Sequence, residues 1–463
     1  MTELQQDYPG YSEPALGVLK NNNVRVWSDV QMETLDGSLE GLILPRADAG
    51  NPQHITLKLR TGYNVGININ RIRRITETGY KKANYKIPEK EFPYDPVKPN
   101  VTLLGTGGTI ASRLDYRTGA VIPAFSPGEL YGAVPELADI ANLTTKRIYA
   151  IFSENMTPDA WIGTAHAIKE EIENGADGIV IGHGTDTMHY TSAALTFMVQ
   201  NTPVPIIMVG SQRSSDRPSS DAALNLIDAT YAAAHGDIAE VLVCMFGPTS
   251  DQYDLLHRGT RVRKMHSSYR STFRTISDTP VATVRNGELR HIKPDYCKRD
   301  KTRKLKLDAV FDDRVTILYY YPNMKPDVID ALVHNGYKGI VFAGTGLGHF
   351  NKPLYPAVKH AIDAGVHIYM TVETLWGYVQ MYVYDTGRDI MDLGVVPAGN
   401  MIPETAYVKL GWALGHTHDR EEVKKLMLTP ICGDLTEREP IDGYMIMQGG
   451  LPEIEQYLLK HRR

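Results

Sequence analysis

Short, uninterrupted runs of apolar residues are the feature that most restricts what this chain can fold into. They recur at residues 178–181, 205–209, 240–245, 314–319, 339–343 and 367–370. Runs this short and this apolar are typical of parallel strands that are buried on both faces of a sheet. Helix-like segments separate several of them, at residues 159–174, 221–235 and 325–335. The alternation predicts the α/β class, with parallel sheets covered by helices on both sides.

The same reading divides the chain into four parts. Residues 1–76 contain short alternating runs, and these predict a small β-barrel domain with strands at 24–27, 39–44, 54–59 and 65–69. Residues 77–98 hold too many prolines for a helix or a central strand, so we predict a proline-rich linker there. We divide the remainder near residue 310 into a larger α/β lobe, 99–310, and a smaller C-terminal α/β lobe, 311–463. The smaller lobe ends in helical stretches, at 403–414, 421–429 and 454–461.

Charge and cysteine content exclude several classes of protein. The 49 basic and 54 acidic side chains give a net charge of −5, so the chain as a whole has no attraction for nucleic acid. The three cysteines, Cys244, Cys297 and Cys432, are far apart and form no Cys-x-x-Cys motif, which argues against a disulfide framework or a zinc site. No apolar run approaches the ~20 residues that cross a bilayer. We therefore expect a cytoplasmic protein with no membrane contact.

A glycine-rich turn follows the first apolar run of the larger lobe, where residues 101–110 read VTLLGTGGTI. The glycines allow a sharp bend and a close approach to a ligand, and they place Thr109 at the carboxyl end of a strand, where α/β sheets bind ligands. The run is no Walker loop, because no lysine follows Gly108, and its glycine spacing does not fit a dinucleotide-binding loop. From these residues alone, a tight turn without chemistry stays open.

A second turn repeats this arrangement, since residues 181–187 read IGHGTDT. A threonine hydroxyl is a poor nucleophile unless a base or a charged group activates it, and Asp186 and Lys264 are candidates for that task. His183 and His189 match no common zinc spacing, so we predict ordinary polar histidines and no metal.

Together the two turns resemble the bacterial-type L-asparaginase family, in which both motifs follow strands in this order. Further segments resemble one branch of that family, the D subunit of archaeal glutamyl-tRNA(Gln) amidotransferase; they are residues 214–223, 261–273 and 403–410. An N-terminal small barrel joined to an asparaginase-like body of two lobes fits the same branch. The resemblance covers nearly the whole chain.

The resemblance implies roles for individual residues. Thr109 would be the nucleophile on an amide carbon, and Thr185, Asp186 and Lys264 would form a second catalytic group that moves protons. Tyr116 falls where the family carries a lid tyrosine. Four further positions would hold the substrate or its oxyanion, and they are Ser153, Glu154, Gly108 and Gly184.

The resemblance also implies an activity and partners. The chain would be a glutaminase- or asparaginase-type amidohydrolase subunit that releases ammonia from glutamine or asparagine. A partner, the E subunit of glutamyl-tRNA(Gln) amidotransferase, would hold ATP and Mg²⁺ and use the ammonia to convert Glu-tRNA(Gln) to Gln-tRNA(Gln). This chain would need no cofactor, would form a homodimer, and would meet tRNA(Gln) through the complex.

Other interpretations stay open on the sequence alone. The protein could be a stand-alone cytosolic L-asparaginase, or a scaffold that kept the fold without the activity. Lys264 lies in a run with Arg258, Arg261, Arg263 and Arg270, which could be a basic loop that faces solvent or RNA. Ser153 could cap a turn, Asp221 could be only a helix N-cap, and residues 344–348 could be a plain tight turn. Residues 371–379 depart from the branch, which is expected to carry a serine-glutamine pair and an arginine there.

Overall fold

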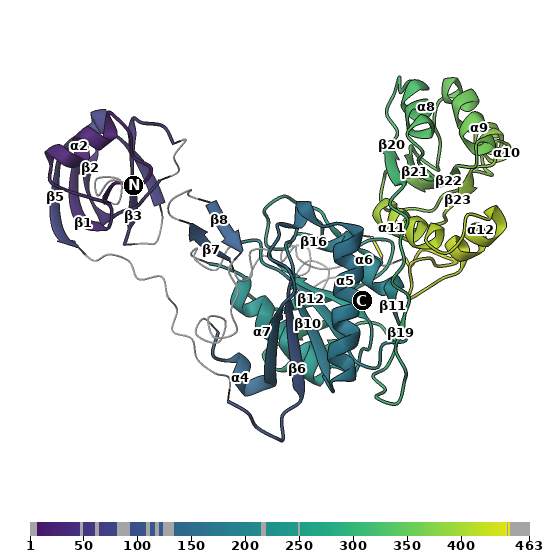
Figure 1. Ribbon diagram of the computed structural model, residues 1–463, viewed down its shortest axis with the longest axis horizontal. Helices are drawn as coiled ribbons and strands as arrows, with labels where there is room; N and C mark the ends of the chain where they lie inside the picture. The colour runs from purple at the N-terminus through teal and green to yellow at the C-terminus, as the bar shows by residue number, and fades with distance from the viewer. Residues whose placement is uncertain are drawn as a thin grey trace, which may run out of the picture.

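The computed structural model describes residues 7–46, 50–60, 64–80, 93–107, 134–213, 219–248, 251–441 and 443–444, and the strand backbone at 112–115 and 120–123. It confirms the α/β class with an additional N-terminal β domain. Figure 1 shows the N-terminal sheet, a larger α/β lobe and a smaller α/β lobe following one another along the longest axis. Within these ranges, no helix is long and apolar enough to span a membrane.

The N-terminal domain is a five-stranded antiparallel sheet with the order β4-β3-β2-β1-β5. Its strands are β1 (Ser28–Thr34), β2 (Gly37–Ile43), β3 (His54–Leu59), β4 (Asn64–Asn68) and β5 (Ile72–Tyr80). The short helix α2 (Ala15–Asn21) buries Ala15 and Leu19 against the sheet, and the 3₁₀ turn η1 (Ile69–Arg71) joins β4 to β5. In the part of the domain that the structure describes, β4 and β5 are not paired with each other.

The first strand is not where the sequence pattern placed it, so the predicted strand at 24–27 is wrong. Val24 and Val26 are buried, but Trp27 has a φ of 75°, which interrupts the extended backbone. Strand pairing begins at Ser28, in a segment whose polar residues leave no apolar run to indicate a strand. β5 also continues to Tyr80, so the first residues of the stretch predicted as linker belong to a strand.

The larger lobe is built on an eight-stranded sheet with the order β18-β17-β14-β13-β12-β10-β6-β9. Its members are β6 (Asn100–Gly105), β9 (Asn142–Arg147), β10 (Gly178–Gly182), β12 (Ile206–Val209), β13 (Val241–Phe246), β14 (Asp254–Arg258), β17 (Ala282–Arg285) and β18 (Glu288–His291). The neighbouring strands β9, β6, β10, β12 and β13 are parallel to one another. The strands β14, β17 and β18 continue the sheet in antiparallel fashion. The strands predicted at 178–181, 205–209 and 240–245 are confirmed.

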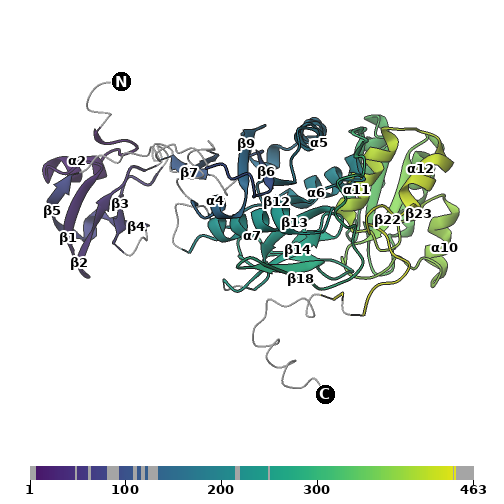
Figure 2. The same cartoon turned by 90° about the horizontal axis from the view of Figure 1, so that it is seen from below.

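Helices cover both faces of this sheet (Figures 1 and 2). They are α4 (Leu137–Ile140), α5 (Pro158–Glu173), α6 (Met188–Met198) and α7 (Ala222–His235). Alternate residues of β6 point to opposite faces, so Leu104 packs in the α5–α6 layer while Val101 and Leu103 pack in the α4–α7 layer. Three small antiparallel pairs lie outside the sheet, namely β7 (Ser112–Asp115) with β8 (Ala120–Pro123), β11 (Val199–Gln200) with β19 (Lys306–Leu307), and β15 (Val262–Lys264) with β16 (Phe273–Thr275).

The smaller lobe has a four-stranded parallel sheet, and the strands predicted at 314–319, 339–343 and 367–370 are confirmed in it. Its strands are β20 (Val315–Tyr319), β21 (Gly339–Gly344), β22 (His367–Val372) and β23 (Val396–Pro397). Its helices are α8 (Asp327–His334), α9 (Tyr355–Asp363), α10 (Asp385–Asp392), α11 (Pro403–Leu414) and α12 (Arg420–Leu428), with the 3₁₀ turn η4 (Lys352–Leu354) before α9. The helix predicted at 454–461 lies outside the described residues.

Helix α11 joins the two lobes. Its apolar residues share one buried cluster with α6 of the larger lobe, and the Trp412 ring stacks on Phe197 with centroids 5.9 Å apart. After α12 the chain returns to the larger lobe through residues 430–439, which we call the crossing segment. There Cys432 O accepts a hydrogen bond from Thr260 Oγ1 (3.0 Å), and Gly433 O accepts one from Arg261 Nε (2.6 Å). The larger lobe is therefore held to the smaller one by a helix and by a returning segment.

Candidate active site

The two turns predicted from sequence leave the sheet side by side. Strands β6 and β10 are parallel neighbours in which Gly105 is paired with Gly182, and Thr106 donates to Gly182 O through both its backbone N–H and its hydroxyl. Gly107 has a φ of 126°, and a Cβ there would lie 2.1 Å from Ile151 O, so only glycine fits. Gly108, Thr109 and Tyr116 lie outside the described residues.

His183 is a structural residue that holds the second turn. Its Nδ1 donates to Gly184 O (2.6 Å), and its Nε2 accepts from Thr191 Oγ1 (2.9 Å), which in turn accepts from Trp161 Nε1 (3.0 Å). Burial lowers the pKa of His183 to about 4, so the ring is neutral at pH 7. The described part of the chain contains no group of three or more side chains suited to a metal ion.

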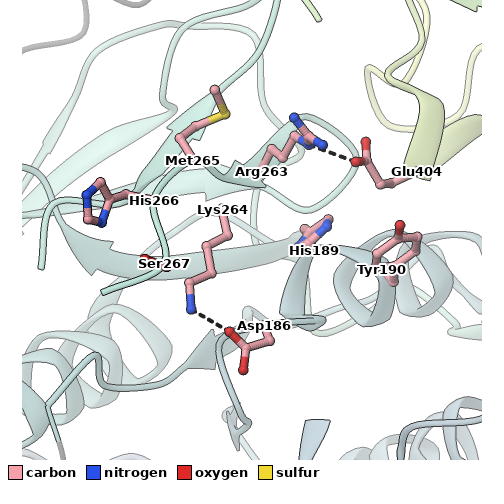
Figure 3. A pocket seen from close by; sticks show the side chains of 9 residues that line it. All are labelled: Asp186, His189, Tyr190, Arg263, Lys264, Met265, His266, Ser267 and Glu404. Carbon is pink, nitrogen blue, oxygen red and sulfur yellow. Dashed lines mark hydrogen bonds and ion pairs between the residues drawn. The ribbon is translucent and has the colours of Figure 1, made fainter. Parts of the chain in front are cut away.

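Lys264 reaches the second turn from the β15–β16 hairpin (Figure 3). Its Nζ donates to Thr185 Oγ1 over 2.9 Å and to Asp186 Oδ1 over 2.6 Å. The lysine side chain is only 9% exposed, whereas that of Asp186 is 68% exposed. The structure thus brings Lys264 into contact with Thr185 and Asp186, which lie 79 and 78 positions before it in the sequence. A hydroxyl in direct contact with an amine and near a carboxylate has a short path for proton transfer.

The segment predicted to hold substrate lies beside the same turn. Ser153 and Glu154 lie in the 3₁₀ turn η3 (Ser153–Asn155); Ser153 is buried and Glu154 is exposed. Thr187 Oγ1 donates to Ser153 O (2.6 Å), and a Cβ on Gly184 would lie 2.7 Å from Ser153 Cβ. The side-chain cap of the following helix α5 is Thr157, so that helix does not need Ser153 as its cap.

The cleft around Lys264 has a volume of about 390 Å³ and contains residues that the sequence did not single out. Its lining is Asp186, His189, Tyr190, Arg263, Lys264, Met265, His266, Ser267 and Glu404 (Figure 3). Arg263 Nε donates to Glu404 Oε1 over 2.7 Å, and Tyr319 Oη donates to the same oxygen over 3.3 Å. Glu404 lies within one of the segments that resemble the branch, but nothing local in the sequence marks it as a partner of Arg263.

Burial disfavours the charged forms of His189 and Tyr190 in the cleft and of Tyr319 beside it. It lowers the pKa of His189 to about 4 and raises the pKa of Tyr190 well above 10. Burial and the Glu404 carboxylate raise the pKa of Tyr319 to about 12. Four charged side chains of the cleft form two ion pairs, Lys264 with Asp186 and Arg263 with Glu404.

Two arginines of the basic run around Lys264 are buried and do not face solvent or RNA. Arg258 is buried and donates to Glu240 Oε2 (2.8 Å), and Arg261 is fully buried and donates to Asn400 O (2.6 Å). Both side chains make internal hydrogen bonds, so the interpretation as a loop facing solvent or RNA is wrong for these two arginines.

Two other open interpretations are decided by backbone contacts. Asp221 precedes α7 but makes no side-chain cap; its carboxylate accepts from the backbone N–H groups of Gln212 and Arg213 and so holds the loop after β12. Residues 344–348 form a tight turn closed by two backbone hydrogen bonds between Thr345 and His349, each 3.0 Å long.

The comparisons with known proteins agree with this architecture. The family models described as "Asparaginase, N-terminal", "Glutaminase/Asparaginase C-terminal domain" and "GatD N-terminal domain" match residues 100–296, 314–427 and 24–77. The thermostable L-asparaginase from Thermococcus kodakarensis superimposes with a TM-score of 0.65 at 33% identity, over 73% of this chain and 100% of its own. L-asparaginase I from Vibrio cholerae superimposes with a TM-score of 0.64 at 27% identity, with the same coverage.

Curated relatives extend the match to the N-terminal domain. The D subunit of glutamyl-tRNA(Gln) amidotransferase from Thermococcus kodakarensis is 48% identical over 88% of this chain and 93% of its own length. The proteins of the same name from Pyrococcus abyssi and Methanothermobacter thermautotrophicus are each 46% identical, over 92% and 93% of this chain and 98% of their own lengths. On this identity and coverage, the chain belongs to the family of glutamyl-tRNA(Gln) amidotransferase D subunits.

Proposed function

We propose that this chain is the asparaginase-type amidohydrolase subunit of a tRNA-dependent amidotransferase and that it hydrolyses glutamine to glutamate and ammonia. The contact of Lys264 with Thr185 and Asp186, at the carboxyl end of β10 and beside the end of β6, is the observation that carries the proposal.

The proposed reaction has two steps. The hydroxyl of Thr109 attacks the side-chain amide carbon of glutamine, the C–N bond breaks, and the nitrogen leaves as ammonia after taking a proton. Water then attacks the acyl-enzyme ester, which frees glutamate and restores the Thr109 hydroxyl. Thr185, Asp186 and Lys264 move the protons in both steps, because their hydrogen-bonded contact is already formed.

Binding of the substrate is assigned to the surrounding turns. Ser153 and Glu154 hold the α-carboxylate and the α-ammonium group of glutamine, respectively, and the exposed carboxylate of Glu154 suits that ammonium. The backbone N–H groups of Gly108 and Gly184 stabilise the oxyanion. Tyr116 closes over the bound substrate. The proximity of Gly184 and Ser153 supports this assignment, since a Cβ on Gly184 would meet the side chain of Ser153.

The curated relatives are named as one subunit of an amidotransferase, which supports a complex with other subunits. We propose that the E subunit of that complex binds ATP and Mg²⁺, receives the ammonia, and amidates Glu-tRNA(Gln) to Gln-tRNA(Gln). This chain would act as a homodimer in the cytoplasm, need no cofactor, and meet tRNA(Gln) through the complex. The match of residues 24–77 to the "GatD N-terminal domain" favours this role over a stand-alone L-asparaginase.

The test is an ammonia assay on the purified chain with glutamine and with asparagine, repeated after co-purification with its partner subunits and tRNA(Gln). We expect glutamine hydrolysis that rises in the complex and that falls at least about a thousandfold in Thr109→Ala and Lys264→Ala. Strong asparagine hydrolysis by the isolated chain, with no response to partners, would favour the stand-alone enzyme. Glutamine-dependent amidation that survives both substitutions would place the chemistry in another subunit.

A further inference from the structure

The strand that carries Lys264 is attached to the smaller lobe by the residue next to it. Arg263 Nε donates to Glu404 Oε1 over 2.7 Å, and Glu404 lies in the first turn of α11. The Glu404 side chain is 2% exposed and that of Arg263 is 24% exposed, so the pair is largely shielded from water. Such a pair holds its geometry more firmly than an exposed pair, and removing one partner leaves the other uncompensated.

Two more contacts tie the same segment to the same end of α11. Thr405 Oγ1 donates to Thr260 O over 2.8 Å. Arg261 donates to Asn400 through both the backbone and the side-chain oxygen of that residue, over 2.6 and 3.0 Å. Residues 260–263 thus belong to the larger lobe by sequence, and the smaller lobe also holds them in place.

Neighbouring residues of a strand point in opposite directions, so fixing Arg263 fixes the direction of Lys264. Figure 3 shows this arrangement: Arg263 extends toward Glu404, while Lys264 extends the other way toward Asp186. A lysine has a flexible four-carbon stem, and its partner Asp186 is 68% exposed. The Lys264–Asp186 pair alone is therefore a weak constraint on the position of the lysine nitrogen.

We propose that Glu404 is a positioning residue for the amidase reaction. It acts through Arg263 to hold Lys264 Nζ within hydrogen-bonding distance of Thr185, and it makes hydrolysis depend on the placement of the smaller lobe. The inference rests on the proposed function, since it assumes that Lys264 takes part in catalysis. Tyr319, the last residue of β20, also donates to Glu404 Oε1 and so helps to hold the carboxylate in place.

The test compares Glu404→Gln with a matched control, Asp228→Asn. Asp228 is also a buried carboxylate, 1% exposed, and it is paired over 3.2 Å with Arg285, which is 17% exposed. That pair lies within the larger lobe, between α7 and β17, away from Lys264. Both substitutions remove one negative charge and keep the shape of the side chain, so any general cost of neutralising a buried carboxylate is present in both.

For the full-length chain, alone and with its co-purified subunits, we expect Glu404→Gln to lower kcat for glutamine about tenfold or more and to change KM less than about threefold. Glu404→Asp, which keeps the charge, should recover part of the loss. Arg263→Ala combined with Glu404→Ala should be no slower than the worse single variant, because both act through one contact. Asp228→Asn should leave kcat unchanged.

The outcomes separate this inference from the function on which it rests. If the wild-type chain hydrolyses glutamine and Lys264→Ala does not, but Glu404→Gln keeps full kcat, the positioning role is refuted and the function stands. An equal loss of kcat in Asp228→Asn and Glu404→Gln would also refute it. If the wild-type protein hydrolyses neither glutamine nor asparagine in the complex, the proposed function itself fails.

Discussion

A Cβ atom on Gly184 would lie 2.7 Å from Ser153 Cβ and 2.8 Å from Ser153 Oγ, closer than side-chain atoms can pack. We therefore predict that Gly184→Ala displaces the side chain of Ser153, to which we assign substrate binding, and raises KM for glutamine about ten- to a hundredfold. Steady-state kinetics on the purified protein measure this. Gly66→Ala is the control, because its Cβ would meet nothing closer than 3.8 Å and it lies in the N-terminal sheet. An unchanged KM in Gly184→Ala would separate Ser153 from substrate binding.

Because several of its histidines are buried and neutral, the folded protein loses stability as the pH falls. Burial lowers the pKa of His257 to about 3, while in the unfolded chain a histidine titrates near 6.5. As the pH falls below about 6.5, the unfolded chain takes up a proton that the folded protein refuses, so the folded state loses about 1.4 kcal/mol per pH unit and per such histidine. His183 and His189 add to this loss down to about pH 4. Asp228 opposes part of it, because burial raises its pKa to about 6.

We predict that His257→Gln reduces this acid sensitivity by about 1.4 kcal/mol per pH unit between pH 6 and 5. Urea unfolding at pH 7, 6 and 5 for the wild type and the variant measures the slope. His257 contacts Thr275 and lies outside the cleft, so hydrolysis at pH 7 reports separately on any distortion of the hairpin that carries Lys264. Identical slopes in the two proteins would show that His257 is protonated in the folded state.

At the scale of elements, the crossing segment is anchored by one ion pair with no solvent contact. Lys409 of α11 donates to Asp434 over 2.5 Å, and both side chains are 0% exposed. Asp434→Ala leaves a buried, uncompensated ammonium, so we predict a loss of about 3–5 kcal/mol in the free energy of unfolding. The double variant Lys409→Met/Asp434→Leu should regain most of it. Glu173→Ala, which breaks an exposed pair with Lys169, should cost less than about 1 kcal/mol in the same urea titration.

How much of each strand can be predicted from sequence follows from how that strand is covered. The parallel strands β10, β12 and β13 are buried on both faces, so their residues are apolar or glycine and the runs are easily recognised. The antiparallel strand β14 reads DLLHR, and its charged ends are buried against internal partners that no local pattern shows. β1 escapes prediction for a related reason, since its burial alternates along a mostly polar segment.

The candidate site divides in the same way. Asp186 and Lys264 can be predicted because each belongs to a short motif, and the structure brings them into contact. The partner of Arg263 cannot, because Glu404 is 141 positions away and the contact exists only once the two lobes have packed. Short-range patterns identify candidate catalytic groups, and long-range packing decides which other groups contact them.

At the scale of the whole molecule, the N-terminal sheet can be tested for its part in catalysis. The solved L-asparaginase from Thermococcus kodakarensis aligns over its entire length with 73% of this chain, so a body of this kind folds without an N-terminal sheet. A truncation should start at residue 93, because Asn142 of the larger lobe bonds to Asp95 O and Lys98 O and so needs that segment.

We predict that the chain truncated to begin at residue 93 keeps kcat for glutamine within about threefold of the full chain but loses most of its support of tRNA amidation in the reconstituted complex. Paired assays of ammonia release and of Gln-tRNA(Gln) formation measure the two effects. A truncated chain that supports amidation as well as the full chain would leave the N-terminal sheet without a role in coupling.

The contacts of the crossing segment can form only late in the synthesis of the chain. Thr260 and Arg261 can form their hydrogen bonds with Cys432 and Gly433 only after another 172 residues have been synthesised. At 5–20 residues per second, the ribosome needs roughly 10–30 s to reach them after the lysine-bearing strand has been translated. During that interval Thr260 and Arg261, which precede the lysine-bearing strand, lack these two partners, so the attachment to the crossing segment forms only when translation is nearly finished.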